Sequence, residues 1–168
     1  LSGQLTRMKY PDDAEVSHAY DAIGRETATT DERGNTTRYE YDPACACRER
    51  IGKVTDALNR ATVNKFDAAG RLTSVIDAAT RQTKFTYDVR NRLTQVTYAD
   101  GTTAHQTYDL AGHQLTETDQ AGRLTRTSYD AAGQLLSVTD ALNQITNYGY
   151  DATGNLLSVT DANNHITQ

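Results

Sequence analysis

The sequence has few of the residues that build a deep hydrophobic core. Leu, Ile, Val and Phe together supply 28 of the 168 residues, about 17%, and Trp is absent. So low a fraction is common in disordered chains, but those also carry high net charge, whereas here it is only −5. Thr, with 26 residues, and Tyr, with 10, both favour β-strands. We therefore expect an ordered, all-β chain with little buried core.

Other absences exclude further classes of protein. No stripe of basic residues points to a nucleic acid partner, and no apolar run approaches the ~18 residues of a membrane span. No signal peptide is visible at the start. The chain begins and ends within a repeat, so we interpret it as a fragment of a longer protein, secreted or displayed on the surface of a bacterium.

An aromatic residue followed by Asp recurs along almost the whole chain. The spacing is 21 residues, except for one interval of 25 that contains an insertion around PACACRER, residues 43–50. Such regular recurrence is typical of repeat architectures. The pairs are Tyr20-Asp21, Tyr41-Asp42, Phe66-Asp67, Tyr87-Asp88, Tyr108-Asp109, Tyr129-Asp130 and Tyr150-Asp151.

Each repeat contains two turn signals, in which Asp is followed three residues later by Gly or Asn. Asp accepts hydrogen bonds from backbone N–H groups two residues on, and Gly or Asn tolerates positive φ. This predicts a type I turn closed by a left-handed residue, a common hairpin connection. The first signal ends at Gly24, Gly70, Asn91, Gly112, Gly133 and Gly154. The second begins at Asp31, Asp56, Asp119, Asp140 and Asp161, with a poor fit at Thr80 and variants at Tyr10–Asp13 and Tyr98–Gly101.

The segments between the turns read as strands of about six or seven residues. Thr83, Phe85 and Tyr87 alternate with polar residues, as expected of a strand with two different faces. Leu72 and Val75 lie three residues apart, which would place them on opposite faces of a regular strand. We therefore expect this strand to be covered on both sides or to contain a β-bulge.

Each 21-residue unit is thus predicted to be one β-hairpin, stabilised by stacking on its neighbours. The predicted fold is all-β, a repetitive stack of antiparallel hairpins in a twisted, curved or spiralling sheet, with the tyrosines in a ladder along one face. We expect a single array of about eight units. They are residues 1–21, 22–42, 43–67 with the inserted Cys-containing loop, 68–88, 89–109, 110–130, 131–151 and the partial unit 152–168.

The phrases YDAAGRLTSVID and YDAAGQLLSVTD resemble the YD repeat of Rhs proteins, bacterial polymorphic toxins, toxin-complex C subunits and teneurins. The resemblance covers essentially the whole chain. It implies a spiral of hairpins that in long members winds into a shell, around a C-terminal effector in toxins. The self-cleaving, shell-closing segment of that family is absent, and no toxin domain follows. Glu26 and Gln114 stand where the repeat usually has Leu.

Acidic and sulfur-containing residues raise the question of metal binding. All 16 aspartates lie in the turn segments, at a period unlike that of calcium-binding nonapeptide repeats, so we interpret them as turn-forming residues. Cys45 and Cys47 are weak metal-ligand candidates, because a zinc site usually needs four ligands and no other Cys or His is close in sequence. We expect no cofactor.

No catalytic constellation stands out. His18, His105, His113 and His165 occupy three different repeat positions, and the spacing supports no Ser-His-Asp arrangement. The tyrosine ladder also suits sugar stacking, although sugar-binding repeats of this length typically carry Trp. We interpret the recurring residues as structural. Among them are the aromatic residues Tyr20, Tyr41, Phe66, Tyr87, Tyr108, Tyr129 and Tyr150.

The main functional hypothesis is a non-enzymatic shell or scaffold segment that helps to enclose or present a C-terminal effector. Its partners would be further repeats of the same chain or of neighbouring copies, joined through strand edges, and the enclosed effector. One alternative is an adhesive or filament-forming surface protein that assembles through those edges. Another is a carbohydrate-binding module of the cell wall.

Overall fold

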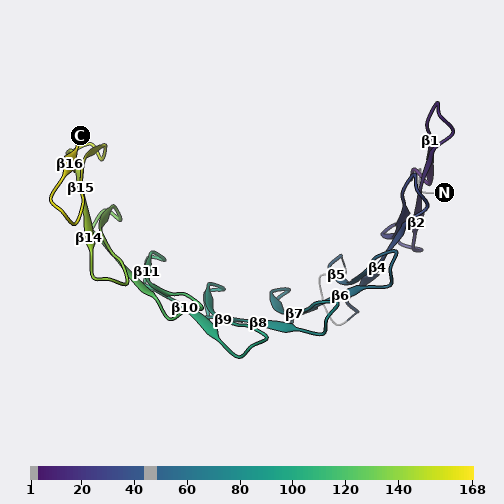
Figure 1. Ribbon diagram of the computed structural model, residues 1–168, viewed down its shortest axis with the longest axis horizontal. Coiled ribbons are helices and arrows are strands. Elements are labelled where there is room, and N and C mark those ends of the chain that lie inside the picture. The colour runs from purple at the N-terminus through teal and green to yellow at the C-terminus, as the bar shows by residue number, and fades with distance from the viewer. Residues whose placement is uncertain (1–3, 44–48) are drawn as a thin grey trace. The chain divides into compact units, whose positions relative to one another are not determined.

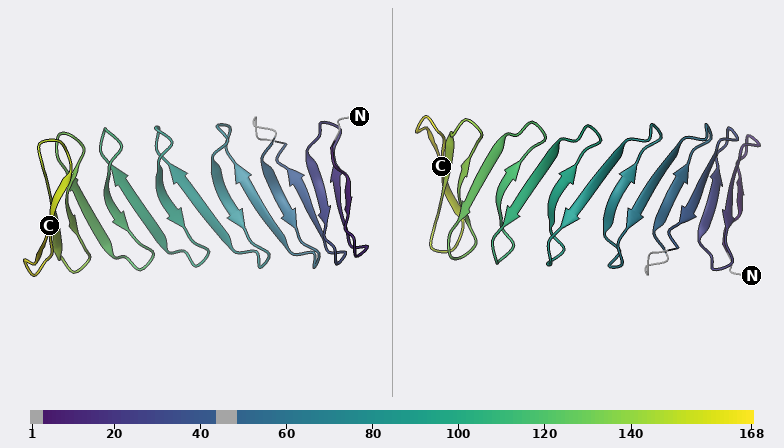
Figure 2. Two further views of the ribbon diagram at one scale, coloured as in Figure 1. Left: turned by 90° about the horizontal axis from the view of Figure 1, so that it is seen from above. Right: turned by 90° about the horizontal axis from the view of Figure 1, so that it is seen from below.

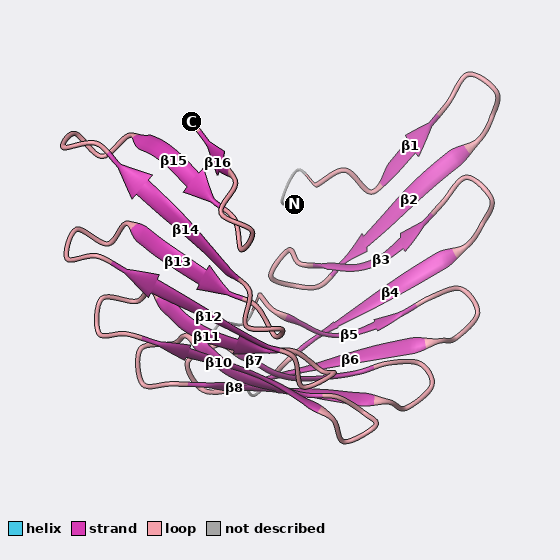
Figure 3. Cartoon of the chain, turned by 60° about the vertical axis from the view of Figure 1, so that its left-hand side comes forward, coloured by secondary structure: helices cyan, strands magenta, loops and turns pink. Residues whose placement is uncertain are grey.

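The computed structural model describes residues 4–43 and 49–168, and within these ranges the chain forms strands and turns but no helix (Figure 3). Strands that follow one another in sequence are neighbours in one antiparallel sheet (Figure 1). The prediction of an all-β stack of antiparallel hairpins is therefore confirmed. No helix in the described part of the chain is long and apolar enough to cross a membrane.

The strands are short and nearly regular in length, as the repeat predicts. In the described residues they are β1 (Arg7–Lys9), β2 (Glu15–Tyr20), β3 (Glu26–Thr30), β4 (Thr36–Tyr41), β5 (Ile51–Thr55), β6 (Ala61–Phe66), β7 (Leu72–Ile76), β8 (Gln82–Tyr87), β9 (Leu93–Thr97), β10 (Thr103–Tyr108), β11 (Gln114–Thr118), β12 (Leu124–Tyr129), β13 (Leu135–Thr139), β14 (Ile145–Tyr150), β15 (Leu156–Thr160) and β16 (Ile166–Thr167).

The chain packs as two units, residues 1–84 and 85–168, with the division inside β8. In each unit, strands that follow one another in sequence pair with each other, and the connecting turns alternate between two edges (Figure 2). Turns that follow an aromatic residue, such as Asp67–Gly70 and Asp109–Gly112, are called YD turns below. Turns that follow the other strands, such as Asp56–Asn59 and Asp119–Gly122, are called distal turns.

A β-bulge next to the YD turns resolves the irregular spacing of Leu and Val. Phe66 pairs with Leu72 and Lys65 pairs with Ser74, so Thr73 is the extra residue. The extra residue turns Leu72 to the same face as Val75, which is opposite Asn64. The bulge is therefore the correct alternative of the two predicted. The same shift occurs between β2 and β3, β4 and β5, β10 and β11, β12 and β13, and β14 and β15.

The bulge gives each unit a face lined by aromatic residues, Leu and Val, called the aromatic face below. In residues 1–84 it includes Tyr41, Phe66 and Val75, and in residues 85–168 it includes Tyr129 and Val138. No second layer of the described chain covers it. Among the described residues, only Gly70, Ser74, Val96 and Ala104 are buried. The accessible surface of 11425 Å² exceeds the roughly 8,200 Å² expected for a compact chain of 18.5 kDa.

Candidate functional site

The aspartates organise the turns through one carboxylate oxygen. Asp67 Oδ1 accepts hydrogen bonds from the backbone N–H groups of Ala69 at 3.0 Å and Arg71 at 2.9 Å. The N–H of Gly70 donates to the Asp67 carbonyl at 2.9 Å and closes the turn. Equivalent Oδ1 bonds recur in both kinds of turn, for example at Asp31 and Asp140. The carboxylates therefore satisfy backbone donors that the turn leaves unpaired.

The fourth turn residue has positive φ, as the sequence predicts. Gly70 has a φ of 79° and Asn143 a φ of 60°. Thr80, which fits the pattern poorly, also adopts this conformation, with a φ of 62° and its N–H bonded to the Asp77 carbonyl at 2.9 Å. Because β-branched residues rarely occupy the left-handed region, this turn is strained at one residue.

The second carboxylate oxygen of many turn aspartates binds the residue after the turn. Arg92 Nε donates to Asp88 Oδ2 at 2.7 Å. Sequence analysis missed this fifth position, although its signal is present as a recurrent Arg directly after the Gly or Asn. The guanidinium pairs are Asp21–Arg25, Asp56–Arg60, Asp67–Arg71, Asp77–Arg81, Asp88–Arg92 and Asp119–Arg123.

At the YD turns the guanidinium also reaches the next repeat. The guanidinium carbon of Arg92 lies 4.7 Å from the centre of the Tyr108 ring, and Arg92 Nη1 donates to the Asp109 carbonyl at 2.7 Å. Arg25 lies 4.1 Å from the centre of the Tyr41 ring in the same way. Each such arginine bonds its own turn and covers the aromatic residue of the following turn. This Asp, Arg and aromatic group is called a clamp below.

Arginines in YD turns are less exposed to solvent than arginines in distal turns. The side chains of Arg25 and Arg92, in YD turns, are 27% and 24% exposed, whereas those of Arg60 and Arg123, in distal turns, are 65% and 74% exposed. Because the residue before the Asp is Thr in the turns of Arg60 and Arg123, no aromatic ring of the YD kind lies beside these arginines. The pairs in distal turns should therefore contribute little to stability.

His113 occupies the arginine position of one clamp. Its Nδ1 lies 2.8 Å from Asp109 Oδ2, and its ring stacks on Tyr129 with a centroid distance of 4.7 Å. The hydrogen bond from His113 holds the pKa of Asp109 below its usual value. The flat imidazole of His113 thus takes the place of a guanidinium between the turn aspartate, Asp109, and the next aromatic residue, Tyr129.

Tyrosine hydroxyls of the repeat bond to the first residue of the preceding strand. Tyr108 Oη donates to the Leu93 carbonyl at 2.8 Å, and Tyr41 Oη donates to the Glu26 carbonyl at 2.8 Å. This carbonyl lies at the bulge, where the ladder of backbone hydrogen bonds is interrupted. Phe66 has no hydroxyl, and there Asn64 Nδ2 donates to the equivalent Ile51 carbonyl at 3.1 Å.

Polar residues interrupt the aromatic face at two places. Glu26, in β3, bonds His18 Nδ1 and accepts a 2.7 Å bond from Thr29 Oγ1. In residues 85–168, Gln114 Nε2 donates to Glu117 Oε2 at 3.1 Å. The departures from Leu at Glu26 and Gln114 thus belong to small polar clusters.

The candidates for metal binding and catalysis are not brought together. The structure shows no group of three or more His, Cys, Asp or Glu side chains placed to hold a metal ion within residues 4–43 and 49–168. Cys45 and Cys47 lie outside the described residues. His105 lies in β10 beside Thr103, and His165 pairs with Asp161, so neither meets the remaining histidines in a common site.

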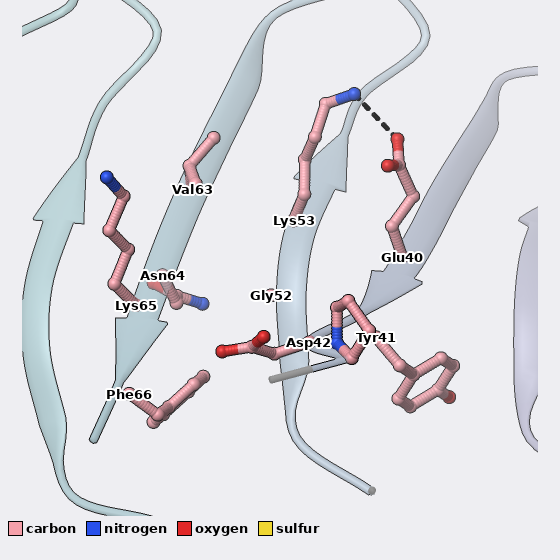
Figure 4. Close-up of a pocket in the computed structure, with 10 residues that line it drawn as sticks. Glu40, Tyr41, Asp42, Gly52, Lys53, Val63, Asn64, Lys65 and Phe66 are labelled. Atoms are coloured by element: carbon pink, nitrogen blue, oxygen red, sulfur yellow. Dashed lines mark hydrogen bonds and ion pairs between the residues drawn. The ribbon is translucent and has the colours of Figure 1, made fainter. Parts of the chain in front are cut away.

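A hollow of about 420 Å³ lies where the insertion interrupts the period (Figure 4). Gly52 is the bulge residue of β5 and lies at its centre, with Val63 and Phe66 of β6 on one side. Lys53 and Lys65 extend along it, and Lys53 Nζ binds Glu40 Oε1 at 2.6 Å.

Comparison with known proteins places these features in a family. The family model described as RHS Repeat matches residues 1–35, 20–61, 66–103, 108–144 and 129–166. A comparison with curated proteins found no match.

Solved structures share the fold at low sequence identity. A crystal structure of TcdB2-TccC3 is 16% identical, with a TM-score of 0.51 over 95% of this chain. A crystal structure of TcdB2-TccC3-Cdc42 is 16% identical over 93% of this chain, with the same TM-score. A Tc holotoxin pore from Photorhabdus luminescens is 17% identical over 95%, with a TM-score of 0.50. The chain spans only 12% of the length of each of these neighbours.

Proposed function

The chain belongs to the RHS repeat family, and from this premise we propose that it is a structural segment of a repeat wall. The wall would form part of a secreted or surface-delivered bacterial protein and help to enclose or present a C-terminal effector. The similar solved structures come from toxin complexes, which supports a role in a toxin. We propose the eight hairpin units as one continuous array within a longer protein.

The observation that carries this proposal is the way in which adjacent hairpins are joined. Apart from the strand ladder, the links run from one repeat to the next, as when Arg92 bonds Asp88 and the Asp109 carbonyl. A hairpin of this length has almost no core of its own, so its stability depends on its neighbours. Contacts of this kind suit a wall that is extended by adding further hairpins.

A non-enzymatic role follows from the same repetition. The aspartates recur at equivalent positions and are occupied by backbone N–H groups and arginines. Equivalent positions in every repeat are poor candidates for one unique active site. The partners would be further repeats, joined at strand edges, and the enclosed effector.

Limited proteolysis tests enclosure in the longer protein that contains this chain. We expect the C-terminal effector to resist protease in the intact protein and to be cut after mild denaturant opens the wall. The control is the effector alone in the same denaturant, which shows its intrinsic protease sensitivity. An effector cut at the same rate in the intact protein and alone would overturn the proposal.

Filament formation through strand edges is the second candidate. β1 pairs only with β2, and β16 only with β15, among the described strands. An unpaired strand side is a template for pairing with another chain. Negative-stain microscopy separates the two candidates, because fibres that lengthen with protein concentration support the filament and hollow particles of one size support the wall.

A further inference from the structure

The charged residues of β4–β8 all lie on one face of the sheet, opposite the aromatic face. The register places them there, because successive side chains of a strand alternate between the two faces. They are Arg38, Glu40, Lys53, Lys65 and Lys84. Glu40 is the only acidic residue among them, although the whole chain has a net charge of −5. This surface, called the basic face below, therefore favours anions.

Two lysines of the basic face flank one serine. Ser74 pairs with Lys65 on one side and with Lys84 on the other, so the lysines are two strand spacings, about 10 Å, apart across the sheet. Ser74 is only 4% exposed, because the long lysine side chains lie on either side of it. Neither Lys65 nor Lys84 has an ion-pair partner among the described residues, so both ammonium groups are available to a ligand.

The fold does not require lysine at these two positions. In residues 85–168 the position of Lys65 is occupied by Ser128, which pairs with Ser137. The position of Lys84 is occupied by Asn147, which pairs with the same Ser137. The strands there keep the same register, and the Ser128 and Ser137 hydroxyls bond each other at 2.7 Å. The two lysines thus add charge to a sheet that forms equally well without it.

The remaining side chains of the basic face limit the kind of ligand it fits. In β4–β8, which are fully described, every aromatic side chain lies on the aromatic face and no large hydrophobic residue is exposed. The basic face therefore has no platform on which nucleic acid bases stack and no apolar group to enter a membrane. Neutral polar side chains lie beside the cations, such as Thr55 and Gln82. This chemistry suits a ligand that combines acid groups with hydroxyl groups.

We propose that the basic face binds a linear anionic polysaccharide. Lys65 and Lys84 each hold one acid group of the polymer, and the neutral polar side chains beside them bond sugar hydroxyls. Lys53 contributes less, because its ammonium group is held by Glu40 at 2.6 Å (Figure 4). The site is on the opposite side of the sheet from the repeat tyrosines, and the inference does not depend on the role of the repeat wall.

Dextran sulfate and dextran, which share a sugar backbone but differ in charge, test the proposal. We expect the 168-residue chain to bind fluorescein-labelled dextran sulfate in fluorescence anisotropy and not to bind labelled dextran. The double variant Lys65→Ser, Lys84→Asn takes its residues from the equivalent positions and should weaken binding about tenfold, through the loss of two exposed ion pairs. Glu40→Ser frees Lys53 and should strengthen binding about twofold.

A double variant with the same change in net charge is the control. Arg33→Gln with Arg123→Gln removes two positive charges from distal turns and should change binding less than about twofold. Equal effects of the two double variants would show general electrostatic attraction without a site, and would overturn the proposal. Tighter binding of polyglutamate or of double-stranded DNA, compared per negative charge, would assign the basic face to an acidic protein or a nucleic acid instead, and would overturn it too.

Discussion

Thr80 is the strained residue among the distal turns. Its φ of 62° lies in the region that suits Gly and Asn, and Asn occupies it at Asn59 and Asn143. The turn nevertheless closes, because the Asp77 carboxylate and carbonyl hold the backbone on both sides of Thr80. The neighbouring hydrogen bonds thus determine the conformation against the preference of the side chain.

Replacing Thr80 by Asn should therefore stabilise the protein. We expect a gain of about 1 kcal/mol in the free energy of unfolding, because Asn tolerates positive φ better than a β-branched residue. Urea denaturation of Thr80→Asn measures it, and Asn59→Thr serves as the reciprocal control with the opposite sign. If both variants unfold at the same urea concentration as the parent, the backbone strain assigned to Thr80 is absent.

The hydroxyl groups of the repeat tyrosines should stabilise the fold, because they donate hydrogen bonds to carbonyl groups at the bulges. Tyr108→Phe removes the donor to the Leu93 carbonyl and should cost about 1 kcal/mol of stability. Tyr98→Phe is the control, because Tyr98 lies in a distal turn and its hydroxyl has no hydrogen-bond partner among the described residues. Chemical denaturation of the two variants should give clearly different losses.

A rescue experiment tests the equivalent carbonyl, that of Ile51, in the repeat that contains the insertion. Asn64→Ala leaves the Ile51 carbonyl without its side-chain donor, and adding Phe66→Tyr should restore much of the lost stability. Failure of the double variant to recover would mean that the hydroxyl does not reach this carbonyl. Asn64 is an example of a residue whose role only the structure reveals, because nothing in the sequence relates it to Phe66 and Ile51.

Adjacent hairpins are joined unequally at their two edges. At the YD turns a clamp spans the junction, whereas at the distal turns the arginine bonds mainly its own Asp. The difference arises because the aromatic residue that precedes each YD turn lies beside the arginine of the turn before it. Junction strength should therefore vary along the array with the residue at the fifth position, which is Arg92, His113 and Gln134 in successive repeats.

Removing one arginine from each edge tests this asymmetry. Arg92→Ala should lower the free energy of unfolding by about 1–2 kcal/mol, because it loses a half-buried ion pair and a cation–π contact. Arg123→Ala, the control at a distal turn, should change it by less than about 0.5 kcal/mol. Native-state hydrogen exchange would locate the loss at the β8 to β11 junctions, and equal losses for the two variants would contradict the clamp.

Across the whole molecule, the turn aspartates make stability depend on pH. Hydrogen bonds lower the pKa of Asp67, first from the Arg71 backbone N–H and then from its guanidinium, and similar bonds lower those of other turn aspartates. A carboxyl group whose pKa is lower in the folded state stabilises that state above its unfolded pKa of about 3.8. This stabilisation is lost as the pH falls below that value.

The expected outcome is a melting temperature that falls steeply below about pH 4. Circular dichroism melts between about pH 7 and pH 2 measure it. Because backbone donors are the main cause at most of these turns, including Asp67, the fall should persist in high salt, which screens only the ion pairs. A melting temperature that is constant down to about pH 2 would contradict this assignment of the aspartates.

The sequence by itself determined the hairpin period, the position of both turns and the all-β fold, because these depend on local backbone chemistry. Asp67 and Gly70 specify a turn through bonds within five residues of chain. The family resemblance follows from the same short motifs. A bulge was one of two alternatives, and Leu72 with Val75 was its only signal.

Only the tertiary structure decided which residues meet between repeats. Arg92 and Tyr108 are 16 residues apart, and their contact depends on the strand register and on the bulge that sets the two turns side by side. Local propensity determines a repeating unit, but contacts between units form only after the backbone has paired, because pairing selects which side chains share a face.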